Sequence, residues 1–207
     1  MTTFLLVASV LTSLAWTAIA ARILIHSTRV SFARPIPWTG DGAVRSVDIV
    51  VPARNEERDI ERTARDLLTQ DYPGATLTVI DDQSTDRTVE ILERIRRDDP
   101  RLHVIRGVER PPGWVGKTWA LHQAVQGTSS EWILFVDGDM RLHPSALSTA
   151  VAEAERTDAD MVSFVPRGEC VTIWQASVAL CLAQVLSQLY PLTAVNDPAR
   201  PEALAAG

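Results

Sequence analysis

The chain has 207 residues, 46% of them hydrophobic and 22% charged, which is enough for one domain with a full core and a small appendage. Its net charge of −6 argues against a nucleic-acid-binding protein, which would usually carry a basic face. Its two cysteines are too few for a disulfide scaffold, and neither has a His or Cys neighbour at zinc-ligand spacing.

The N-terminal segment predicts a membrane anchor. Residues 1–21 carry no charged side chain, and this run is about long enough to cross the hydrocarbon core of a bilayer. Three arginines and no acidic residue follow in residues 22–40, so the positive-inside rule leaves this flank in the cytoplasm. A cleaved signal peptide is the alternative, because Ala18-Ile19-Ala20 resembles a cleavage site, but the positive n-region is missing. We expect a transmembrane anchor over residues 1–25 in the cell membrane, with the following domain cytoplasmic.

Residues 26–46 contain several prolines and glycines and are expected to form a linker. An alternation of apolar strands and amphipathic helices then begins, which predicts an α/β domain over residues 47–170 with a Rossmann-like, mostly parallel sheet and flanking helices. The predicted strands are 47–51, 77–80, 102–105, 132–136 and 161–165. The predicted helices cover about 60–68, 86–97, 117–126 and 144–156.

Individual residues refine this outline. Asn55 is expected to cap the first helix of the domain, and Pro144 to lie in the first turn of the last. The run Trp132–Val136 is almost continuously apolar, which is typical of a strand covered on both faces, so Trp132 and Phe135 are expected in the core.

The end of the chain differs in composition from the α/β domain. Residues 171–192 are apolar and uncharged but contain three glutamines, which favours an amphipathic or membrane-associated helix, either at the membrane interface or packed on the domain. A second membrane span is the alternative. Residues 193–207 are rich in Pro and Ala and are expected to be irregular.

Three polar, acid-rich turns follow predicted strands. They are Pro52-Ala53-Arg54-Asn55-Glu56-Glu57, Asp81-Asp82-Gln83-Ser84-Thr85-Asp86 and Asp137-Gly138-Asp139. One such turn is a weak signal, because Asp is common in turns and at helix N-caps. Ligands of parallel α/β sheets, however, bind beyond the carboxyl ends of the strands. Three acidic turns at that edge therefore predict a binding site.

Crowded carboxylates repel one another, so a positive group is expected among them. A hard divalent cation, Mg²⁺ or Mn²⁺, takes one or two carboxylates while phosphates of a substrate supply further oxygens. Asp137 and Asp139 flank Gly138, which lets the backbone turn tightly and a phosphate approach. Both are candidate metal ligands.

A competing motif is Gly113-Trp114-Val115-Gly116-Lys117-Thr118, which looks like the end of a P-loop. The P-loop pattern requires a glycine five residues before Gly116, where this chain has Pro111. Proline has no N–H to offer a phosphate, which argues against a P-loop NTPase. Lys117 can still contact a phosphate from a helix N-terminus.

Together these residues resemble family 2 glycosyltransferases of the GT-A fold, from about Val47 to Phe164. The resemblance rests on Val50-Val51-Pro52-Ala53-Arg54-Asn55-Glu56, on Asp81-Asp82-Gln83-Ser84-Thr85-Asp86-Arg87-Thr88 and on Asp137-Gly138-Asp139. The loop from Pro111 to Ala120 is similar to that of bacterial enzymes associated with hopanoid and carotenoid biosynthesis.

The resemblance implies a membrane-bound enzyme that binds a nucleotide-diphosphate sugar through Mg²⁺ or Mn²⁺ and transfers the sugar, with inversion, to a lipid-like acceptor. It also implies a role for each matching residue. Pro52, Ala53 and Glu56 frame the base and ribose, and Asp82 contacts the base beside Asp81. Lys117 lies near the phosphates, and Asp137 and Asp139 organise the ribose and the metal.

One departure from the family pattern concerns the general base. In the family this carboxylate lies past the fifth strand, and here the acids after Phe164 are Glu169, Asp197 and Glu202, in no matching motif. We expect a chain truncated after its donor-binding half. The alternatives are a catalytically inactive donor-binding module and a metal-dependent nucleotidyltransferase, although the latter usually has a Gly-rich basic loop after its first strand.

Overall fold

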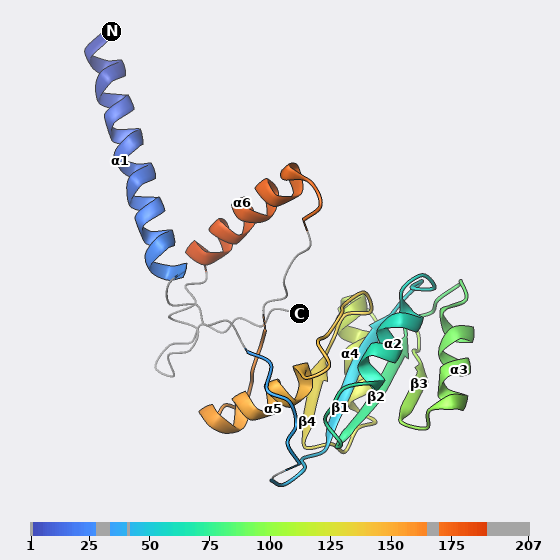
Figure 1. The fold of residues 1–207 in the computed structure, drawn as a ribbon. Helices are drawn as coiled ribbons and strands as arrows, with labels where there is room; N and C mark the ends of the chain where they lie inside the picture. Colours follow the sequence, from blue (N-terminus) through green and yellow to red (C-terminus); the bar gives the residue numbers. More distant parts are fainter. Residues whose placement is uncertain (1, 28–33, 41, 165–169, 190–207) are drawn as a thin grey trace. The chain divides into compact units, whose positions relative to one another are not determined.

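The computed structural model of the chain describes residues 2–27, 34–40, 42–164 and 170–189. These residues belong to two compact units. One unit, Arg34–Val162, contains a sheet and its flanking helices, and the other contains a helix near each end of the chain (Figure 1).

The sheet unit alternates strands and helices along the chain. Its elements are β1 (Val47–Ala53), α2 (Ile60–Leu68), β2 (Ala75–Asp81), α3 (Thr88–Asp98), β3 (Leu102–Arg106), α4 (Gly116–Val125), β4 (Trp132–Phe135) and α5 (Ala146–Thr157). Among the described residues the four strands pair in the order β3-β2-β1-β4, all parallel. The α/β class and the parallel sheet predicted from the sequence are confirmed.

The registers bring the ends of three strands level with one another. Ala53, the last residue of β1, pairs with Asp81 of β2, and Asp81 pairs with Arg106 of β3. Pairing between β1 and β4 stops earlier, at Val50 and Phe135. In a strand, the backbone groups of residues two apart point toward the same neighbouring strand. After Val50, the next backbone N–H of β1 that would donate to β4 is therefore that of residue 52. Residue 52 is a proline, which has no N–H. The chain after β4 is thereby released from the sheet.

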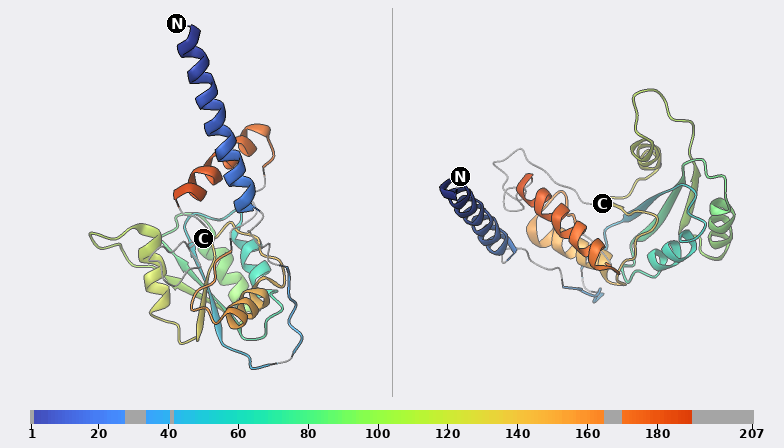
Figure 2. Two further views of the ribbon diagram at one scale, coloured as in Figure 1. Left: turned by 90° about the vertical axis from the view of Figure 1, so that its left-hand side faces the viewer. Right: turned by 90° about the horizontal axis from the view of Figure 1, so that it is seen from above.

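Helices cover both faces of this sheet. Ile49 and Val51 of β1 pack in one core cluster with apolar side chains of α2, α3 and α5, whereas Val50 packs with Ala120 and Ala124 of α4. This alternation follows from the two-residue period of a strand. Figure 2 shows α4 on the opposite face of the sheet from α2 and α3.

Two predictions about strands are wrong. Residues 161–164 form no strand, and Val165 lies outside the described residues. Trp132 is half-buried and Phe135 is 49% exposed, so β4 is not covered on both faces. Within the described residues β4 is an edge strand that pairs with β1 alone, which its apolar composition could not reveal.

Two residues predicted at helix N-termini, Asn55 as a cap and Pro144 in a first turn, lie before their helices. α2 begins at Ile60 after Asp59, and Asn55 instead lies in the preceding loop with a positive φ of 56°. α5 begins at Ala146, so Pro144 precedes the helix. In both cases the residues before the helix make tertiary hydrogen bonds that local sequence preferences do not encode.

Part of the segment predicted as a linker packs on the sheet unit. The Ile36 N–H donates to Thr149 Oγ1 at 2.9 Å, and Ser148 Oγ donates to the Ile36 carbonyl at 2.7 Å. The Trp38 ring contacts the Tyr72 ring edge-on at 5.1 Å between centroids. Residues 36–38 are therefore fixed to α5 and to the turn before β2.

The second unit contains α1 (Thr2–Ser27) and α6 (Ile173–Leu189). The N-terminal segment is helical, but across the described residues no helix combines the length and apolar character needed to cross a bilayer. The predicted N-terminal span is therefore not seen. α6 exposes apolar side chains such as Trp174 and Leu180, which point in different directions around the helix, so it lacks the one-sided pattern of an amphipathic helix.

Candidate functional site

The loops after β1 and β2 meet at the carboxyl edge of the sheet. The Asp82 N–H donates to the Ala53 carbonyl at 2.8 Å and extends the pairing of the two strands by one residue. The Asn55 N–H donates to Ser84 Oγ at 2.9 Å, and the Thr85 N–H donates back to Asn55 Oδ1 at 2.8 Å. These bonds join the first two predicted turns into one wall of the site.

The wall continues to the start of α3. The Glu56 N–H donates to Thr88 Oγ1 at 2.8 Å, and the Glu57 N–H donates to Asp86 Oδ2 at 3.1 Å. Asp86 Oδ1 in turn accepts the Thr88 hydroxyl at 2.6 Å. Burial opposes ionisation of Asp86, but the hydrogen bonds from Thr88 and Glu57 prevail and lower its pKa. Asp86 and Thr88 thus have a structural role.

The two neighbouring aspartates at the end of β2 have different environments. Asp81 is buried, and its Oδ1 accepts the Ser84 N–H at 3.2 Å, with Arg106 Nη1 4.0 Å from Oδ2. The half-buried Asp82 carries an Oδ2 atom 3.4 Å from Nη1 of the exposed Arg54. Asp82 therefore reaches the surface of the site, and Asp81 lies beneath it.

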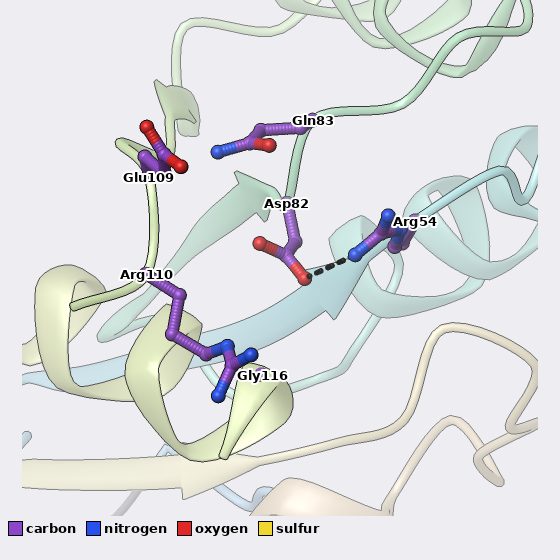
Figure 3. A pocket seen from close by; sticks show the side chains of 6 residues that line it. All are labelled: Arg54, Asp82, Gln83, Glu109, Arg110 and Gly116. Carbon is purple, nitrogen blue, oxygen red and sulfur yellow. Dashed lines mark hydrogen bonds and ion pairs between the residues drawn. The ribbon is translucent and has the colours of Figure 1, made fainter. Parts of the chain in front are cut away.

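Asp82 lines a pocket of about 190 Å³ beside the end of β2. The pocket is lined by Arg54, Asp82, Gln83, Glu109, Arg110 and Gly116. Figure 3 shows the Gln83 amide directed toward Glu109 and the Arg110 side chain extending toward Gly116. Its lining offers both donors and carboxylate acceptors, as a polar ligand requires.

The sequence did not point to Glu109 and Arg110 as site residues, and it placed Gln83 in the second acidic turn without giving it a role. Glu109 and Arg110 lie on the loop between β3 and α4, and the Arg110 guanidinium donates to the Trp114 carbonyl. The Trp114 ring packs at 5.2 Å from the Trp119 ring, so it has a packing role in this loop. The unusual Pro/Gly content of the loop was the available signal.

The third acidic turn follows β4 and closes with a hydrogen bond from the Met140 N–H to the Asp137 carbonyl at 3.1 Å. Asp137 pairs with the Lys117 ammonium at the start of α4. A Cβ at the buried Gly138 would lie 3.5 Å from Glu56 Cγ and equally close to the Pro52 carbonyl oxygen. The third turn therefore packs on the first, in agreement with the prediction that the acidic turns lie at one edge of the sheet.

Carboxylates crowd at this contact. Burial raises the pKa of Glu56, and the negative charges of Asp139, Asp59 and Asp86 raise it further. Asp139 is exposed to solvent and close enough to repel Glu56. A bound cation would relieve this repulsion.

The acidic turn fits a divalent cation in part. Across the described ranges no group of three or more His, Cys, Asp or Glu is arranged to hold a metal by itself. Mg²⁺ and Mn²⁺ need fewer protein ligands, because they accept oxygens from water and from substrate phosphates. Asp139 offers an exposed carboxylate for this purpose, whereas Asp137 already has a partner in Lys117. The donor set suits a metal that is completed by a diphosphate.

Comparison with known proteins agrees with this geometry. The family model described as "Glycosyl transferase family 2" matches residues 48–193. Among curated relatives, beta-monoglucosyldiacylglycerol synthase of Nostoc sp. is 35% identical over 136 residues, which are 64% of this chain and 29% of the relative. The 4,4'-diaponeurosporenoate glycosyltransferase of Staphylococcus haemolyticus is 27% identical over 110 residues, 53% of this chain and 28% of the relative. The chain thus spans less than a third of the length of these relatives.

Two solved structures share the fold. The mannosyltransferase PcManGT from Pyrobaculum calidifontis, in complex with GDP-Man and Mn²⁺, has a TM-score of 0.58 and 24% identity over 75% of this chain and 45% of its own. Glucosyl-3-phosphoglycerate synthase from Mycobacterium tuberculosis, in complex with Mn²⁺, UDP and phosphoglyceric acid, has a TM-score of 0.53 and 25% identity over 78% of this chain and 56% of its own. With the family model matching most of the chain, and with this fold and acidic edge, the chain belongs to glycosyl transferase family 2.

Proposed function

We propose that this chain binds a nucleotide-diphosphate sugar together with Mg²⁺ or Mn²⁺ and acts as the donor-binding part of an inverting glycosyltransferase. The observation that carries the proposal is the convergence of the pocket at Asp82 and the carboxylate of Asp139 on one edge of a parallel sheet. The structure of glucosyl-3-phosphoglycerate synthase from Mycobacterium tuberculosis with bound Mn²⁺ and UDP supports the choice of metal and ligand.

We assign the nucleoside to the wall formed by the first two loops. Asp82 and Gln83 offer an acceptor and a donor to the base, and Pro52 and Ala53 of β1 frame the base and ribose together with Glu56 from the loop after β1. Asp81 holds the Ser84 N–H and keeps the loop in shape for Asp82.

The diphosphate is assigned to the space between α4 and the third turn. Lys117 lies at the N-terminus of α4, where the helix dipole and free N–H groups favour an anion. Asp139 would hold the metal and orient the ribose together with Asp137, once Asp137 is released from Lys117. A metal bound there would supply positive charge to the departing nucleoside diphosphate.

The acceptor is proposed to be lipid-like, because one relative, of Nostoc sp., is named a beta-monoglucosyldiacylglycerol synthase and another is named a 4,4'-diaponeurosporenoate glycosyltransferase. The exposed apolar side chains of α6 support work at the cytoplasmic face of the cell membrane. We assign no general base to the described residues, so transfer by this chain alone is a separate question from donor binding.

Calorimetry tests the proposal. The full chain is titrated with UDP in the presence of Mn²⁺ and again after EDTA. Binding is expected with the metal and lost with the chelator. Asp99→Ala, an acid at the far end of α3, is the matched control and should bind like wild type. A folded protein that binds no nucleoside diphosphate, or binds it equally well in EDTA, would overturn the metal-dependent function.

A further inference from the structure

The segment between β4 and α5 contains the third acidic turn but lies outside any helix or strand. β4 ends at Phe135 and α5 begins at Ala146. Its last ladder bond is from the Val136 N–H to the Val50 carbonyl at 3.1 Å, because Pro52 cannot donate the next. Some other part of the molecule must set the position of Asp137 and Asp139.

Polar side chains on α2 and in the turn after it make that connection. Thr63 Oγ1 donates to the Gly138 carbonyl, between the two aspartates, at 2.8 Å. Gln70 Nε2 donates to the His143 carbonyl at 3.0 Å, and Gln70 Oε1 accepts the Leu147 N–H at 3.1 Å. The backbone adds one more bond, from the Asp71 N–H to the Pro144 carbonyl at 3.0 Å.

Both side chains are buried, Thr63 at 3% and Gln70 at 7% exposure. A buried backbone carbonyl without a partner is costly, so these hydrogen bonds fix the segment more strongly than exposed ones would. The first turn also lies beside Gly138, because Glu56 Cγ and the Pro52 carbonyl oxygen are each 3.5 Å from where a Cβ on this glycine would be, which is an ordinary contact distance. The acidic turn is therefore held by α2 through Thr63, while the side chain of Asp139 is exposed to solvent.

We infer that Thr63 and Gln70 are positioning residues that hold the Asp137-Gly138-Asp139 turn in the geometry needed for a divalent cation. The inference rests on the proposed function for its consequence in binding, but the hydrogen bonds stand without it. Residues that orient metal ligands without touching the metal typically change affinity about 10- to 100-fold when mutated. Removing either side chain should have an effect of that size.

The first variant is Thr63→Val, which replaces the hydroxyl with a methyl group of similar size. Thr63→Ser keeps the hydroxyl and serves as the conservative rescue. Thr78→Val is the matched control, because Thr78 is another buried threonine whose hydroxyl donates to Asp48 Oδ1 at 3.0 Å, inside the sheet and away from the turn. Gln70→Met provides a second, independent test.

Two measurements are made on the full chain. Calorimetric titration with UDP and Mn²⁺ should show affinity reduced about 10-fold or more in Thr63→Val and Gln70→Met, and near wild type in Thr63→Ser and Thr78→Val. Hydrogen exchange, without any ligand, should show the Met140 amide exchanging faster in Thr63→Val, with the amides of β1 and β2 unchanged.

These outcomes separate the two ideas. Equal affinity in wild type and Thr63→Val, or an equal loss in Thr63→Val and Thr78→Val, overturns the positioning role. If wild type binds no UDP at all, the proposed function fails, and hydrogen exchange alone decides the inference. An unchanged Met140 exchange rate in Thr63→Val then overturns it.

Discussion

The acidic turn after β2 and the acidic turn after β4 look alike in sequence but are held in different ways. The turn after β2 is tied to the loop after β1 by reciprocal hydrogen bonds between Asn55, Ser84 and Thr85. The turn after β4 makes an ion pair to α4 and a hydrogen bond from Thr63 of α2, and Gly138 within it lies beside Glu56 and Pro52.

This difference separates two tasks within one site. Where carboxylates accept backbone N–H groups, as Asp81 and Asp86 do, they build the loop and have little capacity left for a ligand. Asp139 is exposed and repels a neighbouring carboxylate, so its charge is available to a cation. Acidic residues of similar appearance thus divide into structural and ligand-binding ones according to their hydrogen bonds.

The largest expected effect is at Asp139. Since changes outside the direct ligand shell already cost 10- to 100-fold, Asp139→Asn should weaken Mn²⁺-dependent UDP binding by at least about 100-fold. The free energy of unfolding should stay near wild type, because the side chain is exposed. Calorimetry and urea denaturation measure the two quantities. Asp82→Asn is the comparison and should keep the dependence on metal; identical behaviour of the two variants would erase the proposed division of tasks.

The second expected effect concerns stability. Asn55→Ala removes the acceptor for the Thr85 N–H and puts Ala at a φ of 56°, which should lower the free energy of unfolding by about 2 kcal/mol, roughly half from each cause. Asn55→Gly tolerates the backbone conformation and should lose only about 1 kcal/mol. Urea midpoints at constant m-value test this. Equal losses for Ala and Gly would show that the conformation of Asn55 is unimportant.

A smaller effect is expected at Lys117, whose ammonium competes with a metal for Asp137. Lys117→Met should let Mn²⁺ alone bind more tightly, by up to about 5-fold, since an exposed ion pair is worth at most about 1 kcal/mol. Titration with Mn²⁺ in the absence of nucleotide is the measurement. Arg54→Met, which removes the pair with Asp82, is the control and should leave the Mn²⁺ affinity unchanged. Weaker Mn²⁺ binding in Lys117→Met would contradict the competition.

The smallest effect is the pH dependence caused by Glu56. Its pKa is raised in the folded chain by burial and by Asp139, so ionised Glu56 lowers stability at neutral pH. As the pH falls through the raised pKa, Glu56 becomes protonated in the folded chain and this loss of stability disappears. Below the ordinary value of 4.5, Glu56 is protonated in the unfolded chain as well, so no further change is expected. Glu56→Gln should therefore be more stable than wild type at neutral pH and lose this advantage below 4.5. The measurement is the urea midpoint of wild type and of Glu56→Gln from neutral pH to below 4.5. A difference between their midpoints that does not change with pH would show that the repulsion at Glu56 is unimportant.

Much of the donor-binding edge was predictable from local patterns. The apolar runs of β1, β2 and β4 identified three strands, and the acid-rich turns after them identified the edge where ligands bind. The pocket residues Glu109 and Arg110 were not predictable in this way. They line the same pocket as Asp82 from a loop between β3 and α4, an arrangement that depends on how α4 packs across the sheet.

The sequence by itself determined the alternating α/β order, the parallel sheet and the position of the acidic turns, because apolar periodicity and chain order carry that information. Tertiary structure alone decided that β4 lies at the edge of the sheet formed by the described residues, that Asn55 closes a loop rather than capping α2, and that Thr63 donates to Gly138. The physical reason is that these features are hydrogen bonds between residues far apart in the chain. Local preferences of either partner do not encode such bonds, which form only when packing brings the partners together.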